Sequence, residues 1–251
     1  MTTTNSWITC PKPNPKASLR LFCFPYAGGA ASIFRSWPDQ LAPHIEVCPV
    51  ELPGRGKRLR EPLVTGLLPL METLVPALLP YLDIPFAFFG HSMGALISFE
   101  LARQLRRQEA PSPRHLFISG RRAPQLPARK PPIHDLPKSE LIEELREYNG
   151  TPEAVLENQE LMELFLPILR ADFGINDTYT YTSEPPLNCP ISVFGGLEDT
   201  DARSDDLAPW RDQTTSTFTV HMFPGDHFFI NNNNECNQLL QLITKFAIAP
   251  V

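Results

Sequence analysis

The sequence Gly-His-Ser-Met-Gly at residues 90–94 is the segment best suited to chemistry. It follows the apolar run 86–89 and precedes a run with helical periodicity that begins with small residues. A serine on such a tight strand-to-helix turn has strained backbone geometry, and side chains two positions away on either side would clash. The turn also sets the hydroxyl at a helix N-terminus, where developing negative charge is stabilised. We therefore predict that Ser92 is a nucleophile.

A serine nucleophile needs a base, and a carboxylate must orient that base. After this type of turn the acid comes next in the chain and the histidine last. Only His134, His221 and His227 follow Ser92 at a usable distance. His134 lies in a proline-rich stretch that precedes the strands expected to supply the acid, and His221 alternates within a strand. His227 is the predicted base, because it follows the last strand in a loop that can reach the edge of the sheet.

The orienting acid is expected in the loop after the preceding strand, 191–194. Asp199 is the predicted acid, with Asp201 and Glu198 as alternatives in the same loop. Asp226 is adjacent to the predicted base and would struggle to point at the ring of its own neighbour. We therefore interpret Asp226 as a turn former.

An oxyanion hole requires two backbone N–H groups. One is expected from Met93, directly after the nucleophile, and the other from the loop after the first strand. We call that loop, residues 24–30, the oxyanion loop. Its glycines, Gly28 and Gly29, allow the chain to turn and expose an amide, and we predict the Ala27 N–H as the second donor. The alternative is that residues 24–30 form a simple turn between a strand and a helix.

Short apolar runs alternate with longer runs of helical periodicity along most of the chain. Six runs are interpreted as strands: 19–24, 45–50, 86–89, 116–119, 191–194 and 217–223. Five runs are interpreted as helices: 34–41, 67–82, 95–107, 206–213 and 235–246. Several strands are almost continuously apolar, which is typical of strands covered on both faces. The alternation predicts an α/β fold with a mostly parallel sheet.

Residues 121–190, which we call the insertion, interrupt this alternation. Their first part is rich in proline, and acidic segments of helical periodicity follow at 138–149 and 159–173. No strand pattern occurs there. We expect the insertion to be a helical lid on a single domain that spans residues 1–251.

Length and composition limit the class of protein. A chain of 251 residues buries enough apolar surface to fold without disulfide or metal staples. Five cysteines, without a Cys-x-x-Cys pair, argue against a disulfide framework and a cysteine-rich zinc site. The most apolar stretch, 67–82, is interrupted by prolines and a glutamate and falls short of a membrane span. Residues 1–7 do not resemble a secretory signal, so we expect a cytoplasmic protein. No metal ion is expected.

The charge is unevenly distributed. Residues 1–130 carry a balance of +8 and residues 131–251 a balance of −14, which gives the formal net charge of −6. Basic clusters of this kind can attract an acidic partner. Nucleic acid is a poor candidate, because the clusters lack interleaved aromatic residues and the chain is acidic overall.

Five landmarks in the sequence resemble the type II thioesterases of non-ribosomal peptide and polyketide synthesis. They are FPYAGG, ELPGRGKR, FFGHSMGA, FGGLED and FPGDHFFI, and the resemblance covers residues 19–246. It implies an α/β-hydrolase fold with a helical lid, and hydrolysis of acyl groups from the 4′-phosphopantetheine thiol of carrier proteins. It also implies a catalytic triad of Ser92, Asp199 and His227 with oxyanion donors Ala27 and Met93. The polar run 231–234 departs from the family, in which a more ordinary helix start is expected.

The resemblance also implies a partner. Acyl or peptidyl carrier proteins are acidic near their pantetheine serine, and the pantetheine arm arrives with the substrate, so no cofactor is expected. Docking is predicted through basic residues after the second and fourth strands, in a protein expected to be monomeric: Arg55, Lys57, Arg58, Arg60, Arg121 and Arg122. The alternatives are a serine esterase acting on free small molecules, and an acyltransferase in which an alcohol or amine replaces water.

Overall fold

The computed structural model describes residues 6–248 and has a six-stranded parallel sheet at its centre. The strand order is β2-β1-β3-β4-β5-β6, and every neighbouring pair is parallel. The strands are β1 (Leu19–Phe24), β2 (Ile45–Pro49), β3 (Phe86–His91), β4 (Leu116–Ser119), β5 (Ile191–Gly196) and β6 (Phe218–Phe223). The predicted parallel α/β architecture is therefore confirmed.

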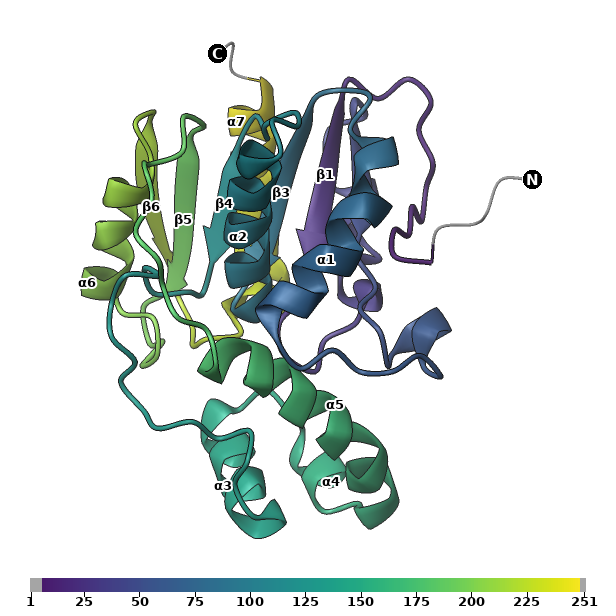
Figure 1. Cartoon of the computed structure of the whole chain (residues 1–251), viewed down its shortest axis with the longest axis vertical. Helices are drawn as coiled ribbons and strands as arrows, with labels where there is room; N and C mark the ends of the chain where they lie inside the picture. The colour runs from purple at the N-terminus through teal and green to yellow at the C-terminus, as the bar shows by residue number, and fades with distance from the viewer. Residues whose placement is uncertain (1–5, 249–251) are drawn as a thin grey trace.

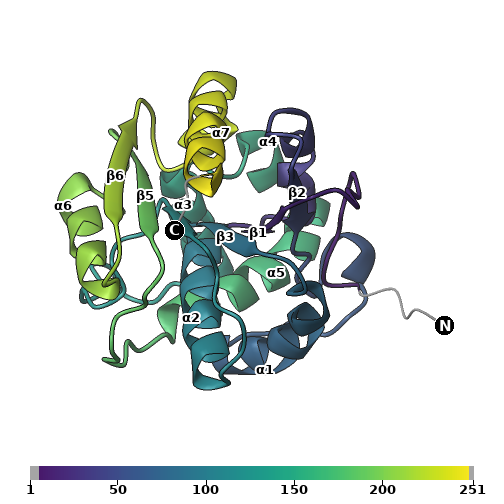
Figure 2. The ribbon, with the colours of Figure 1, turned by 90° about the horizontal axis from the view of Figure 1, so that it is seen from above.

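Helices cover both faces of the sheet (Figures 1 and 2). The long ones are α1 (Leu67–Leu78) and α2 (Met93–Arg107) on one face and α7 (Asn233–Ile248) on the other. Phe22 and Phe88 are buried towards α1 and α2, whereas Phe89 and Leu240 belong to the core beneath α7. Because both faces are buried, the strands are apolar on both sides. Among the described residues, no helix is long and apolar enough to cross a membrane.

The insertion places its helices at the carboxyl ends of the strands (Figure 1). They are α3 (Lys138–Tyr148), α4 (Glu153–Leu156) and α5 (Gln159–Asp177). Leu141 and Leu145 of α3 pack with Met162 and Leu166 of α5 in an apolar cluster separate from the two sheet cores. The sequence did not predict α4.

Two predicted helices differ from the structure. Residues 34–41 do not form an α-helix but two short 3₁₀ turns, Ala31–Phe34 and Trp37–Asp39. The predicted helix 206–213 is a short helix α6 (Ser204–Leu207) followed by the 3₁₀ turn Ala208–Gln213. A proline stands near the start of two of these turns and cannot donate an N–H group, so α-helical bonding does not continue through it.

A short N-terminal strap, residues 7–9, bonds to the carboxyl end of the outer strand β2 and to the two residues that follow it. The Thr9 N–H donates to the Pro49 carbonyl at 2.9 Å, and the Glu51 N–H donates to the Trp7 carbonyl at 2.8 Å. Ile8 and Val50 form the antiparallel bridge between these two bonds. The segment 1–7, which shows no secretory pattern, lies largely outside the described residues.

Candidate active site

Ser92 stands on a strained turn between β3 and α2. Its φ of 54° and ψ of −112° lie outside the regions that ordinary residues prefer. A Cβ atom at Gly90 would lie 2.1 Å from the Gly94 carbonyl oxygen, and one at Gly94 would lie 2.1 Å from the Phe24 carbonyl oxygen. The Ser92 N–H donates to the Ser119 carbonyl of β4 at 2.8 Å. The two glycines are thus sterically required by the turn that presents the serine.

His227 and Asp199 are hydrogen-bonded at the carboxyl ends of β5 and β6. His227 Nδ1 lies 2.8 Å from Asp199 Oδ2. The other carboxylate oxygen accepts the N–H groups of Asp201 and Ala202 at 2.8 and 3.0 Å. Burial opposes ionisation of Asp199, but these bonds and His227 outweigh it and keep the pKa of Asp199 below its ordinary value. The carboxylate is thus ionised and fixed in orientation.

The other candidate acids occupy different positions. Glu198 is exposed, and the Asp201 side chain makes no hydrogen bond to His227 within residues 6–248. Burial raises the pKa of Asp201. Asp226 Oδ1 accepts the Phe228 N–H at 2.8 Å, which is the behaviour of a turn former. The geometry therefore favours Asp199 over all three.

The two remaining histidines have other neighbours. His134 Nδ1 lies 2.9 Å from Asp177 Oδ2 at the end of α5. His221 lies on β6, where its ring is near Phe194 and Phe246. Of the three histidines considered, only His227 lines a cavity together with Ser92.

Ala27 and Met93, the predicted oxyanion donors, lie after β1 and at the start of α2. Met93 is the first residue of α2, where a backbone N–H has no acceptor within the helix. Ala27 lies at the carboxyl end of β1, and no acceptor for its N–H occurs among the described residues. Gly28 follows with a φ of 77°, and the Gly29 N–H closes the loop onto the Tyr26 carbonyl at 2.9 Å. Ala27 and Ser92 line the same small cavity.

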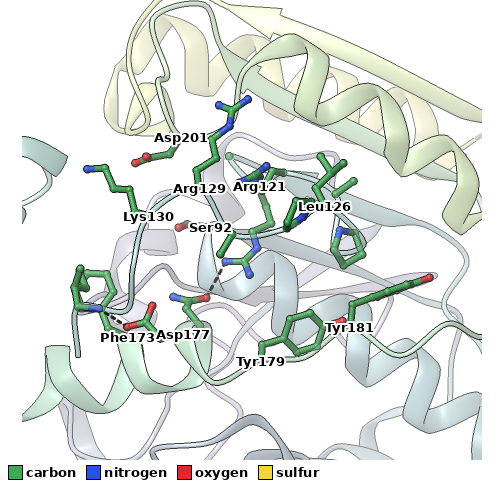
Figure 3. A pocket seen from close by; sticks show the side chains of 18 of the residues that line it. Ser92, Arg121, Leu126, Arg129, Lys130, Phe173, Asp177, Tyr179, Tyr181 and Asp201 are labelled. Carbon is green, nitrogen blue, oxygen red and sulfur yellow. Dashed lines mark hydrogen bonds between the residues drawn. The ribbon is translucent and has the colours of Figure 1, made fainter. Parts of the chain in front are cut away.

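Two cavities meet at Ser92. The larger one, of about 410 Å³, is lined by residues 120–131 and by polar residues at the end of α5 (Figure 3). In this view Arg129, Lys130 and Asp201 lie on one side, with Tyr179 and Tyr181 opposite. The smaller cavity, of about 50 Å³, is lined mainly by apolar and aromatic residues: Tyr26, Ala27, Leu145, Tyr148, Leu169, Phe173 and Phe228.

Two residues of the insertion, Tyr148 and Phe173, line both cavities together with Ser92 and His227. Sequence reasoning did not identify either residue. In the sequence, each residue only continues the apolar face of a helix. Such a pattern predicts burial but does not indicate which side chains reach the active site.

The docking prediction is wrong for Arg55 and Arg58, because both side chains are buried. Arg58 is 4% exposed, donates to the Glu51 carbonyl at 2.9 Å and lies over the Trp7 ring. Arg55 is 6% exposed and forms an ion pair with Asp172 of α5. Neither guanidinium can meet a partner's surface.

The other four predicted docking residues differ in exposure. Lys57 and Arg60 are exposed, as a docking surface requires. Arg122 is half-buried and lies 3.6 Å from Asp206. Arg121 is also half-buried, and it lines the larger cavity.

No group of three or more His, Cys, Asp or Glu side chains within residues 6–248 is arranged to hold a metal ion. The site itself brings together a serine and a histidine–aspartate pair.

Comparison with known proteins identifies the family. The thioesterase domain model matches residues 19–247. The gramicidin S biosynthesis protein GrsT of Aneurinibacillus migulanus is 49% identical over 226 residues, which cover 90% of this chain and 88% of that protein.

Solved structures agree with this assignment. The thioesterase RedJ of the prodiginine pathway in Streptomyces coelicolor matches with a TM-score of 0.88 and 41% identity, over 93% of this chain and 92% of RedJ. YbtT, a type II thioesterase from the yersiniabactin NRPS/PKS pathway, matches with a TM-score of 0.84 and 31% identity, over 96% and 97% of the two chains. The predicted α/β-hydrolase fold is confirmed by these neighbours. The chain therefore belongs to the thioesterase family, and within it to the type II thioesterases of non-ribosomal peptide and polyketide synthesis that its motifs predicted.

Proposed function

We propose that this thioesterase removes acyl groups from the 4′-phosphopantetheine thiol of carrier proteins and so frees carriers that hold a wrong or stalled group. The observation that carries the proposal is the junction of two unequal cavities at Ser92, beside the His227–Asp199 pair. A thioester has two arms of different chemistry, and such a junction accommodates both. The relatives from biosynthetic pathways support the same substrate class.

The proposed reaction assigns one role to each polar group. His227 accepts the Ser92 proton as the serine oxygen attacks the thioester carbonyl carbon, and the Ala27 and Met93 N–H groups stabilise the oxyanion. The thiol leaves with the proton from His227, and an acyl-serine remains. His227 then takes a proton from water as the water oxygen attacks the acyl carbon, and it returns this proton to the Ser92 oxygen as the acid is released. Asp199 holds the Nδ1 proton and stabilises the imidazolium in both steps.

The two cavities suit the two arms of the thioester. We assign the pantetheine arm, with its amides and phosphate, to the larger cavity, where Arg121, Tyr179 and Asp201 supply polar groups. We assign the acyl group to the smaller cavity, which has a largely apolar lining. Its small volume favours short acyl chains.

Intact-mass spectrometry of several acyl carrier proteins, before and after incubation with the enzyme, tests the proposed function. Loss of the acyl mass with retention of the pantetheine arm is expected, and the Ser92→Ala variant is the control. Equal activity on free small thioesters and on carriers would indicate a general esterase. Products formed with added alcohols or amines in preference to the free acid would indicate an acyltransferase.

Arg121 is expected to contribute to substrate binding in the larger cavity. Burial lowers its pKa to about 10, and its side chain has one acceptor among the described residues, Asn176 Oδ1 at 2.8 Å. No carboxylate in the described part of the chain forms an ion pair with it, and a cation in such surroundings favours an anionic ligand. The phosphate of the arm is an anion that the substrate brings.

Arg121→Met is therefore expected to raise KM for an acyl-CoA by about 10- to 100-fold. KM for the same acyl group on N-acetylcysteamine is expected to change less than about threefold, because this thioester has no phosphate that could bind Arg121. Steady-state kinetics on the two thioesters check this. An equal rise on both substrates would refute the phosphate assignment.

Lys57 and Arg60 are the predicted docking residues that remain exposed. Reversing both to glutamate is expected to lower kcat/KM for an acidic acyl carrier by about 5- to 10-fold at low salt, because charges at the rim of an interface mainly set the association rate. Added salt should reduce the difference from the wild type. Activity on an N-acetylcysteamine thioester is the control, and an equal loss there would show that these residues support the fold and not docking.

A further inference from the structure

A buried ion pair joins the insertion to the loop after β2. Arg55 Nη1 lies 2.7 Å from Asp172 Oδ2, and Arg55 Nη2 lies 2.7 Å from Asp172 Oδ1. Arg55 is 6% exposed and Asp172 is 1% exposed. The two residues are 117 positions apart in the sequence, so the pair is a tertiary contact between α5 and the sheet domain.

The same pair holds the oxyanion loop from two directions. Asp172 Oδ2 accepts the Gly28 N–H at 2.7 Å, and Arg55 Nη1 donates to the Gly29 carbonyl at 3.0 Å. The Gly28 N–H belongs to the peptide group directly after Ala27, and the Gly29 carbonyl lies one residue further along the loop. A side chain from α5 and one from the loop after β2 therefore hold the segment that follows the Ala27 N–H, the second oxyanion donor.

The packing around Gly28 supports the same arrangement. A Cβ atom at Gly28 would lie 2.8 Å from Leu169 Cδ2, one turn before Asp172 on α5. The helix thus lies directly against the oxyanion loop. Gly28 has a positive φ of 77°, which glycine adopts readily, and its N–H donates to the Asp172 carboxylate.

We propose that Arg55 and Asp172 form a positioning pair that orients the Ala27 N–H towards the thioester oxyanion. By this contact α5 is part of the catalytic framework, and the oxyanion hole is complete only while α5 is docked. The proposal rests on the proposed acyl-serine mechanism and adds to it two residues that do not touch the reacting atoms. A donor that is misdirected loses interaction with the transition state more than with the bound substrate.

Asp172→Asn tests the pair, because asparagine keeps the size of the side chain and removes its charge. With an N-acetylcysteamine thioester, kcat is expected to fall by about 100-fold, as for the loss of one oxyanion donor, with KM within about twofold of the wild type. The inhibition constant of an alkyl trifluoromethyl ketone, whose adduct with Ser92 carries an oxyanion, should rise by about the same factor as kcat/KM falls.

Glu46→Gln is the matched control. Glu46 is also buried, and it accepts bonds from Arg20 at 2.7 Å and from the Asn14 N–H at 2.9 Å. It lies at the amino-terminal ends of β1 and β2, away from the oxyanion loop. Its loss should lower the melting temperature without changing kcat or the ketone inhibition. If Asp172→Asn has no more effect than Glu46→Gln on these two measurements, the pair is only structural and the proposal is refuted.

A double variant separates positioning from folding where Asp172→Asn is too unstable to measure. Replacing Arg55 by methionine and Asp172 by leucine removes both buried charges together, which is far less destabilising than removing one. The folded double variant should still show the 100-fold loss in kcat, whereas near-normal kcat would overturn the proposal. Failure of the wild type on both the small thioester and an acyl carrier would instead count against the acyl-serine mechanism, so the two failures are distinguishable.

Discussion

Replacing Ser92 by alanine is expected to lower kcat by about 10⁶-fold, and replacing His227 by alanine should cost about as much. Either change removes the covalent route, because the nucleophile and its base act as one unit. What remains is the rate enhancement due to the Ala27 and Met93 amides and to substrate binding. The double variant should therefore be hardly worse than either single variant.

Turnover of a small acyl thioester measures this effect, and the melting temperature serves as a control for folding. A serine-directed fluorophosphonate should label Ser92 in the wild type, and the Ser92→Ala variant should take up no label. Covalent labelling of another residue, or substantial turnover by Ser92→Ala after removal of trace wild type, would show that the nucleophile lies elsewhere.

Asp199→Ala is expected to lower kcat by about 10⁴- to 10⁵-fold. The Asp199 carboxylate accepts hydrogen bonds from the Nδ1–H group of His227 and from two backbone N–H groups, so it fixes both the tautomer and the ring orientation. Without Asp199, the proton of neutral His227 is not held on Nδ1, and the imidazolium loses the carboxylate that stabilises its charge.

Asp201→Ala is the comparison that tests the choice of acid. Its carboxylate makes no bond to His227 in the described part of the chain, so kcat is expected to fall by less than about tenfold. The two variants are compared on the same thioester, each with its melting temperature. Near-normal turnover by Asp199→Ala together with a large loss in Asp201→Ala would reverse the assignment.

The sheet could be predicted closely from the sequence, whereas several helices could not. Strands 19–24 and 116–119 have the predicted bounds, because a strand buried on both faces leaves a continuous apolar run. Residues 34–41 have apolar side chains at helical spacing, but successive 3₁₀ turns bury the same side chains. Periodicity alone does not distinguish the two, and Pro38 favoured the shorter turns.

The reacting groups could be predicted because the strained turn at Ser92 constrains its neighbours locally. The glycines two positions away are a direct consequence of backbone clashes, and chain order then selects His227 and Asp199. Asp172 left no comparable signal, because it is one acidic residue in a helix with several. Its partners, Arg55 and the Gly28 N–H, lie 117 and 144 positions away. For the same reason the basic cluster around Arg55 predicts an exposed side chain, although Arg55 is buried.

The N-terminal strap along β2 has a consequence for self-association. An outer strand of a sheet presents unpaired N–H and carbonyl groups, which template the addition of a strand from another molecule and lead to aggregation. Here the backbone of Trp7 and Thr9 occupies those groups at Pro49 and Glu51. The bridge between Ile8 and Val50 lies between these two bonds. At the carboxyl end of β2, a few residues of the chain itself therefore occupy backbone groups that a strand from another molecule would need.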